Sequence, residues 1–214
     1  MDGPRILLAD DHRIFLEGLK NLLEKDFNII GMAENGRELI EKVEEHSPDI
    51  VVTDISMPEL NGIDATVQIK KIDPDIKVIL LTMHGDVTYA TRGFEVGASA
   101  YVMKQAAADE LLSAIKEAMR GRTFVTPMIA GDLIKSFREG GGIRPDDVQA
   151  RLTLRQREVL QLLAEGFSGK EVADKLNISP RTVEFHKYKM MEELNLSTSA
   201  ELIHYAIKHG IISI

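Results

Sequence analysis

Five polar residues of this sequence stand directly after apolar runs that could form buried strands. Three are carboxylates, one is a hydroxyl and one is an ammonium: Asp10, Asp11, Asp54, Thr82 and Lys104. If the runs are parallel strands, their carboxyl ends meet at one edge of a sheet, where open α/β folds bind ligands. The sequence therefore predicts that these five side chains gather in one pocket.

A pocket of this composition can accept a phosphoryl group on an aspartate. Clustered carboxylates repel one another unless a cation balances their charge, and Mg²⁺ binds carboxylate oxygens, waters and phosphoryl oxygens. The Lys104 ammonium would neutralise one phosphoryl oxygen, and the Thr82 hydroxyl would donate to another. Singly, each residue has a plainer interpretation as a helix cap, a strand end or a surface charge. Their combination is what indicates a site.

Strand and helix patterns alternate along residues 1–122, as in a doubly wound α/β fold. We predict a five-stranded parallel sheet in the flavodoxin-like order 2-1-3-4-5, which would bring the polar strand ends together. The predicted strands are 6–9, 29–33, 50–53, 78–82 and 100–103, and the predicted helices are 13–25, 36–45, 62–72, 87–95 and 107–120.

Residues 123–149 form a predicted connection between two domains. An amphipathic stretch over 127–137 is followed by three consecutive glycines, Gly140 to Gly142. Because glycine is unfavourable in the interior of helices and strands, this segment predicts a flexible linker.

Residues 150–214 contain only helical patterns, so they predict a small all-α domain. Asn177 and Ile178 make a short turn, so about three residues join the second helix to the third, which is the spacing of a helix-turn-helix motif. Capping residues mark the starts of the four predicted helices: Thr153, Ser168, Ser179 and Thr198.

The third of these helices, from Pro180 to about Leu194, is the segment that would enter the major groove of DNA. Its apolar stripe of Val183, Met190 and Leu194 should face inward. The candidate DNA contacts are Lys170, Arg181, Thr182, Glu184, Phe185, Lys187, Tyr188 and Lys189.

These candidates have distinct expected roles. The lysines and Arg181 would contact phosphates, Glu184 could accept from cytosine N4, and Phe185 could contact a thymine methyl. The alternative is that Phe185 and Tyr188 belong to the core, as aromatic residues of small helical domains usually do.

The composition restricts the classes of protein to which this chain can belong. It has 214 residues and no cysteine, which excludes disulfide frameworks and thiolate metal sites. We find neither a signal-type N-terminus nor an apolar run near the roughly 20 residues of a membrane span. The expectation is a cytoplasmic protein without a membrane partner.

The net charge of −8 is unevenly distributed. Residues 1–150 contain 17 Lys and Arg against 26 Asp and Glu, whereas residues 151–214 contain 9 against 8. Since the acidity belongs to the first part, a local basic face in the second part could still bind DNA.

The first part of the chain resembles the receiver domain of two-component response regulators. The resemblance implies that Asp54 accepts a phosphoryl group from a cognate histidine kinase. It also implies that Asp10, Asp11 and the backbone carbonyl of Ser56 help to hold Mg²⁺. The matching segments are Ala9-Asp10-Asp11-His12, Val52 to Pro58 with Gly62, Leu81-Thr82, Gly97-Ala98 and Tyr101-Val102-Met103-Lys104.

The same resemblance assigns a switching role to two further residues. Thr82 and Tyr101 match the hydroxyl and aromatic positions that move together when receivers are activated. One departure is that Gln105 follows Lys104, where many receivers have proline.

The second part resembles the LuxR-type output domain of the NarL/FixJ class of response regulators, over segments 152–160, 170–173 and 178–186. This resemblance implies that Glu184, Phe185 and Tyr188 face the groove. It also implies that the last helix, which carries Leu202 and Ala206, pairs two output domains on an inverted repeat. The alternative for Leu202 and Ala206 is simple core packing.

We interpret the chain as a phosphorylation-controlled transcription factor, with a receiver at 1–122 and a DNA-binding domain at 150–214, that binds double-stranded DNA as a homodimer. Three alternatives are open. An aspartyl-phosphate phosphatase would resemble Asp-x-Asp, but the second position here is Ser56. A pure interaction module would not need the full acidic set, and RNA binding would call for stacking aromatics on a sheet.

Overall fold

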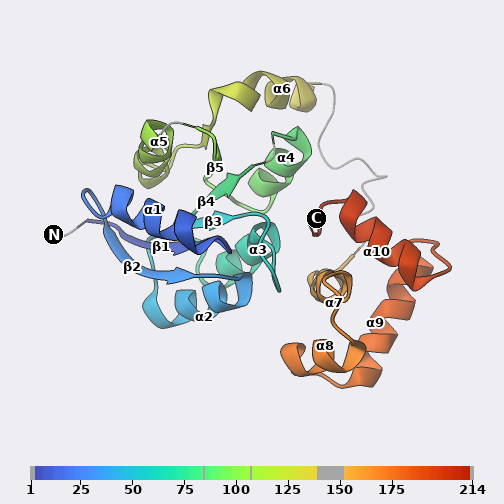
Figure 1. Cartoon of the computed structure of the whole chain (residues 1–214). Helices are drawn as coiled ribbons and strands as arrows, with labels where there is room; N and C mark the ends of the chain where they lie inside the picture. The colour runs from blue at the N-terminus through green and yellow to red at the C-terminus, as the bar shows by residue number, and fades with distance from the viewer. Residues whose placement is uncertain (1–2, 84, 107, 139–151, 213–214) are drawn as a thin grey trace. The chain divides into compact units, whose positions relative to one another are not determined.

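The computed structural model describes residues 3–83, 85–106, 108–138 and 152–212. The chain forms two compact units, which we treat separately. The first carries the β-sheet and the second is helical (Figure 1). The predicted linker at Gly140 to Gly142 lies outside the described residues.

A parallel sheet forms the centre of the first unit. Within the described residues its order is β2-β1-β3-β4-β5-β6, so the predicted order 2-1-3-4-5 is confirmed and extended by one strand. The strands are β1 (Arg5–Ala9), β2 (Asn28–Ala33), β3 (Ile50–Asp54), β4 (Lys77–Thr82), β5 (Ala100–Met103) and β6 (Phe124–Val125).

Helices cover both faces of this sheet, and each predicted helix is present within two residues of its expected ends. They are α1 (Arg13–Leu23), α2 (Gly36–His46), α3 (Gly62–Ile72), α4 (Val87–Glu95), α5 (Ala108–Met119) and α6 (Pro127–Arg138). Figure 1 shows α1 and α2 on opposite sides of the sheet.

Strand periodicity explains how the two faces are filled. Alternate residues of a strand point to opposite faces, so Ile6 and Leu8 of β1 pack with Leu16 of α1 and Ile115 of α5 in one buried cluster. All residues of β3 are buried, as expected for a central parallel strand covered on both faces. Two-sided burial thus fixes the strand ends that carry the polar residues.

All five predicted strands are present, and one short strand that was not predicted extends the sheet. β6 pairs in parallel with β5, matching Ala100 to Phe124 and Tyr101 to Val125. The helix that follows, α6, packs against α4 and buries Ile129 and Leu133. The segment from β6 through α6 therefore belongs to the first unit, although the predicted receiver ended at residue 122.

Four helices make up the described part of the second unit: α7 (Leu154–Ala164), α8 (Gly169–Leu176), α9 (Pro180–Glu193) and α10 (Ser199–Lys208). The predicted capping residues Thr153 and Ser168 each form a capping box, and Ser179 caps α9 with Pro180 in its first turn. Asn177 adopts a left-handed conformation with φ of 52° and ends α8. The helix-turn-helix prediction is confirmed.

None of the helices in the described ranges has the length and apolar character required to cross a membrane.

Candidate functional site

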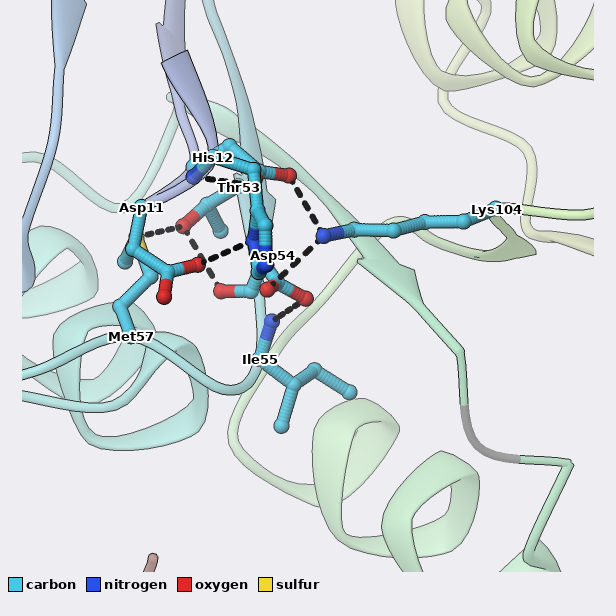
Figure 2. Close-up of polar contacts among 8 residues, drawn as sticks. Asp11, His12, Thr53, Asp54, Ile55, Met57 and Lys104 are labelled. Carbon is cyan, nitrogen blue, oxygen red and sulfur yellow. Dashed lines mark hydrogen bonds and ion pairs between the residues drawn. The ribbon is translucent and has the colours of Figure 1, made fainter. Parts of the chain in front are cut away.

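The carboxyl ends of β1, β3 and β5 bring three of the predicted pocket residues into direct contact. Lys104 Nζ lies 2.6 Å from Asp10 Oδ2 and 2.9 Å from Asp54 Oδ2. Figure 2 shows the lysine side chain extending across the pocket toward Asp54. The side chains of Lys104, Asp10 and Asp54 are 7%, 0% and 5% exposed, so one ammonium bridges two buried carboxylates.

Local backbone contacts hold Asp54 in place. Its Oδ1 accepts a hydrogen bond of 2.7 Å from Ile55 N–H, and its backbone carbonyl accepts one of 3.0 Å from the Thr53 hydroxyl. The loop after β3 returns to this point because Gly62 N–H donates to the Ile55 carbonyl at 2.9 Å. A Cβ atom on Gly62 would lie 2.0 Å from the Asp54 carbonyl oxygen, so only glycine allows this approach.

The two carboxylates keep the lysine protonated. Burial lowers the pKa of the Lys104 ammonium, but its hydrogen bond to Asp10 and the charge of Asp54 outweigh burial and hold the pKa above its ordinary value of 10.5. The pocket therefore contains a fixed positive charge at neutral pH.

A second group of ligand atoms adjoins Asp10. Atoms of Asp10, Asp11 and His12 that could bind a metal lie within 4.8 Å of one another in the described part of the chain. His12 Nδ1 is 2.9 Å from Asp11 Oδ1 and 3.3 Å from Asp10 Oδ1. The carboxylate oxygens suit a hard cation, so this donor set fits Mg²⁺. Ser56, the predicted carbonyl ligand, is half-buried at the start of the loop after β3.

His12 was missed as a pocket residue by the sequence reasoning. It occupies the N-cap position of α1 without making a side-chain cap, and its ring is turned to the two carboxylates instead. Its adjacency to Asp10 and Asp11 in the sequence was the available signal.

The two predicted switch residues are also in contact. Thr82 and Tyr101 are 0% exposed, on the neighbouring strands β4 and β5. Burial raises the pKa of the Tyr101 phenol, and a hydrogen bond with the Thr82 side chain opposes that rise. A hydrogen bond between neighbouring strands therefore links these two buried side chains.

In the second unit, α9 presents two large aromatic side chains to solvent. Phe185 is 61% exposed and Tyr188 is 64% exposed, so the alternative that they belong to the core is wrong. The stripe of Val183 and Met190 is fully buried, and Leu194 packs against it. Together with the exposed Arg181, these two aromatic residues give the helix an accessible face.

Comparison with known proteins assigns the chain to a family. Residues 6–116 match the family described as Response regulator receiver domain, and residues 150–206 match the one described as Bacterial regulatory proteins, luxR family. This chain belongs to the NarL/FixJ class of response regulators. It is a two-component response regulator with a LuxR-type DNA-binding domain that regulates transcription.

Relatives of this response regulator match along nearly its whole length. It is 35% identical to the oxygen regulatory protein NreC of Staphylococcus carnosus, covering 97% of this chain and 99% of NreC. It is 33% identical to the transcriptional regulatory protein DegU of Brevibacillus brevis, covering 98% and 95%.

Solved structures of RcsB are similar as well. RcsB from Salmonella enterica serovar Typhimurium, bound to a promoter in the presence of the phosphomimetic BeF3⁻, is 29% identical with a TM-score of 0.62, covering 97% of this chain and 100% of that one. A structure of two RcsB dimers bound to two parallel DNAs is 28% identical with a TM-score of 0.60, covering 98% and 100%.

The remaining predicted residues of this response regulator divide into exposed and buried ones. Lys170, Arg181 and Lys189 are exposed, whereas Thr182 and Lys187 are half-buried. For pairing, the prediction named Leu202 and Ala206, but they are 2% and 0% exposed and lie in the core with Val159 and Val172.

The placement of Leu202 and Ala206 requires a correction. Because α10 packs on α7, these two residues fill the domain's own core and offer no accessible surface for a partner. Any pairing through α10 must use other residues, such as Ile203, an apolar residue that is 37% exposed.

Proposed function

We propose that Asp54 of this response regulator accepts a phosphoryl group from a histidine kinase in a Mg²⁺-dependent reaction, and that this modification controls dimerisation and DNA binding. The observation that carries the proposal is the bridge that Lys104 makes between the buried carboxylates of Asp10 and Asp54. Buried carboxylates beside a fixed ammonium match the requirements of phosphoryl transfer, which depends mainly on positioning and charge neutralisation.

In the proposed reaction, a carboxylate oxygen of Asp54 forms a bond to phosphorus as the bond from phosphorus to the donor's histidine nitrogen breaks. Lys104 exchanges its contact with Asp54 for a phosphoryl oxygen, and Thr82 donates its hydroxyl to another. Asp10, Asp11, Asp54 and the Ser56 carbonyl would hold Mg²⁺, which supplies charge neutralisation at the transferring group.

Reorganisation of Thr82 would then reach Tyr101, since their side chains are hydrogen-bonded. This transmission favours a second receiver conformation in which two chains pair. A two-fold dimer would match an inverted-repeat operator of double-stranded DNA, and the RcsB dimers on DNA are a precedent among the similar structures.

For DNA recognition we propose that α9 enters the major groove. Glu184, Phe185 and Tyr188 would face base edges, while Lys170, Arg181 and Lys189 would contact phosphates and Thr182 would add a polar contact. The exposure of both aromatic residues supports this orientation.

The decisive test is the intact mass of the protein after incubation with Mg²⁺ and acetyl phosphate. We expect one phosphoryl adduct on the wild type and on Asp75→Asn, a control at an exposed aspartate, and none on Asp54→Asn. The treated wild type should also form more dimer and be retained more strongly by DNA. An adduct on Asp54→Asn, or equal DNA retention with and without the adduct, would contradict the proposal.

A further inference from the structure

Lys187 does not stand on the exposed face of α9. It follows Val183 by four residues and precedes Met190 by three, and both of these side chains are 0% exposed. Residues three and four apart share one helix face. The backbone of Lys187 therefore lies on the buried stripe, and its side chain, 20% exposed, reaches the surface only at its end.

The ammonium at that end is engaged by two residues of the DNA-facing side. Lys187 Nζ lies 3.1 Å from Glu184 Oε2 and 3.3 Å from Glu184 Oε1. It also lies 5.5 Å from the centroid of the Tyr188 ring, within reach of a cation–π interaction. The Lys187 ammonium thus forms an ion pair with Glu184 and a cation–π interaction with Tyr188, both within its own helix.

Glu184 is confined from the other side as well. A Cβ atom on Gly169, the first residue of α8, would lie 3.5 Å from Glu184 Oε1. The Glu184 side chain is 46% exposed, so it is accessible although bounded by α8 and by Lys187. A bare carboxylate would be repelled by DNA phosphates, whereas the Glu184–Lys187 pair carries no net charge.

We propose that Lys187 is a positioning residue for base recognition, and that it is not the phosphate contact predicted from the sequence. It holds the Glu184 carboxylate as the acceptor for a cytosine amino group and keeps Tyr188 in place beside it. This inference rests on the proposed binding of double-stranded DNA by α9.

The salt dependence of DNA binding separates the two roles of Lys187. Each phosphate contact contributes about 0.9 to the slope of log K against log salt concentration. Removing Glu184 and Lys187 together, as Glu184→Gln with Lys187→Met, leaves the net charge unchanged and should leave the slope of the full-length protein unchanged. The matched control Lys170→Met, at an exposed lysine, should lower the slope by about 0.9.

Base preference tests the positioning role directly. The full-length wild type, Glu184→Gln, Lys187→Met and the double variant would each select binders from a pool of random duplex DNA. We expect all three variants to lose the same C·G preference, by roughly tenfold or more. The double variant should lose no more than either single one, because the two residues act as a unit. Lys187→Arg, which keeps the charge, should retain the preference.

Defined outcomes would overturn this inference. If Lys187→Met keeps the wild-type preference while the double variant lowers the salt slope by about 0.9, Lys187 is a phosphate contact. If Glu184→Gln keeps the preference, Glu184 is not the reader that Lys187 positions. Failure of the wild type to select any sequence, or to bind DNA, would instead contradict the proposed function. Methionine retains the apolar stem, and thermal melting of each variant verifies folding.

Discussion

At the scale of single residues, Lys104 determines the charge balance of the acidic pocket. It contacts Asp10 and Asp54 at once, and all three side chains are buried. Removing one partner of a buried ion pair leaves an uncompensated charge, which costs far more than the pair itself contributes. The lysine is therefore important for stability as well as for the proposed phosphoryl transfer.

We expect Lys104→Met to destabilise the sheet-bearing unit by about 3 kcal/mol at pH 7. The folded-state pKa of Lys104 is raised above 10.5, so its contribution is fully present below that pH and is lost as the pH rises through the folded-state value. Urea denaturation at pH 7, 9 and 11 would measure this loss. The free energy of unfolding of the exposed control Lys116→Met should stay within about 0.5 kcal/mol of the wild-type value. A wild-type free energy of unfolding for Lys104→Met at pH 7 would contradict the expectation.

Residue types and spacing predicted the pocket well but did not predict which side chains turn toward it. Asp10, Asp54 and Lys104 were found because each follows a strand, and strand ends converge in parallel sheets. The contact of His12 with the carboxylates depends on its rotamer, which no spacing rule gives. Leu202 was assigned to a partner surface because the sequence could not show how much apolar area α7 covers.

At the scale of elements, the loop from β3 to α3 determines how Asp54 is presented. The Gly62 position that a Cβ would occupy is 2.0 Å from the Asp54 carbonyl oxygen and 3.1 Å from Ile55 Cα. Both are backbone atoms, which cannot rotate away as a flexible side chain would. Any larger residue must displace the end of β3.

The expected effect of Gly62→Ala is a destabilisation of about 3 kcal/mol, the upper end for adding a methyl group to a packed site. Slower formation of the phosphoryl adduct should accompany it, because Asp54 moves with β3. Chemical denaturation and intact-mass time courses measure the two effects. Gly18→Ala on α1, where no atom lies within 4 Å of the new Cβ, should be neutral or stabilising by up to about 1 kcal/mol; equal effects of both substitutions would refute this account.

One hydroxyl links the residue that follows β6 to the end of β5. Thr126 is 1% exposed, and its Oγ1 accepts a hydrogen bond of 3.0 Å from Met103 N–H. We predict that Thr126→Val, which leaves this buried donor without its acceptor, destabilises the unit by about 2 kcal/mol. Thr126→Ser should retain most of the stability. Amide hydrogen exchange at Met103 would report the lost bond, and unchanged protection in Thr126→Val would rule the prediction out.

Elements with strong local signals were predictable, and those that depend on tertiary pairing were not. The helices of the second unit begin directly after Thr153, Ser168, Ser179 and Thr198, because these capping residues satisfy free backbone N–H groups locally. β6 has only two residues, too few for a period of two to appear, and it exists because it pairs with β5.

At the scale of the whole molecule, two of the hydrophobic clusters that the described residues form belong to different units. One includes Leu16, Val52 and Ile115, and the other includes Val159, Val172 and Leu202. Each core belongs to one compact unit. Separate cores imply separate cooperative unfolding transitions.

Calorimetry of the full chain should therefore show two unfolding transitions. Mg²⁺ should raise the midpoint temperature of only one of them. At a Mg²⁺ concentration of about 100 times its dissociation constant, the transition of the sheet-bearing unit should gain about 2.7 kcal/mol. EDTA should reverse the gain, and Asp11→Asn should reduce it. Equal shifts of both transitions would mean that the ion does not act through the acidic pocket.

The pairing of β6 with β5, and the packing of α6 on α4, bear on how this protein can be recombined with others. A chimaera that joins its first part to a foreign output module has to retain the chain through Arg138. A graft ending at residue 122 would remove the acceptor of Met103 N–H next to Lys104 and expose the edge of β5. In a chimaera built on the shorter boundary, an altered response could come either from the foreign output module or from damage to the acidic pocket. The experiment could not distinguish the two causes.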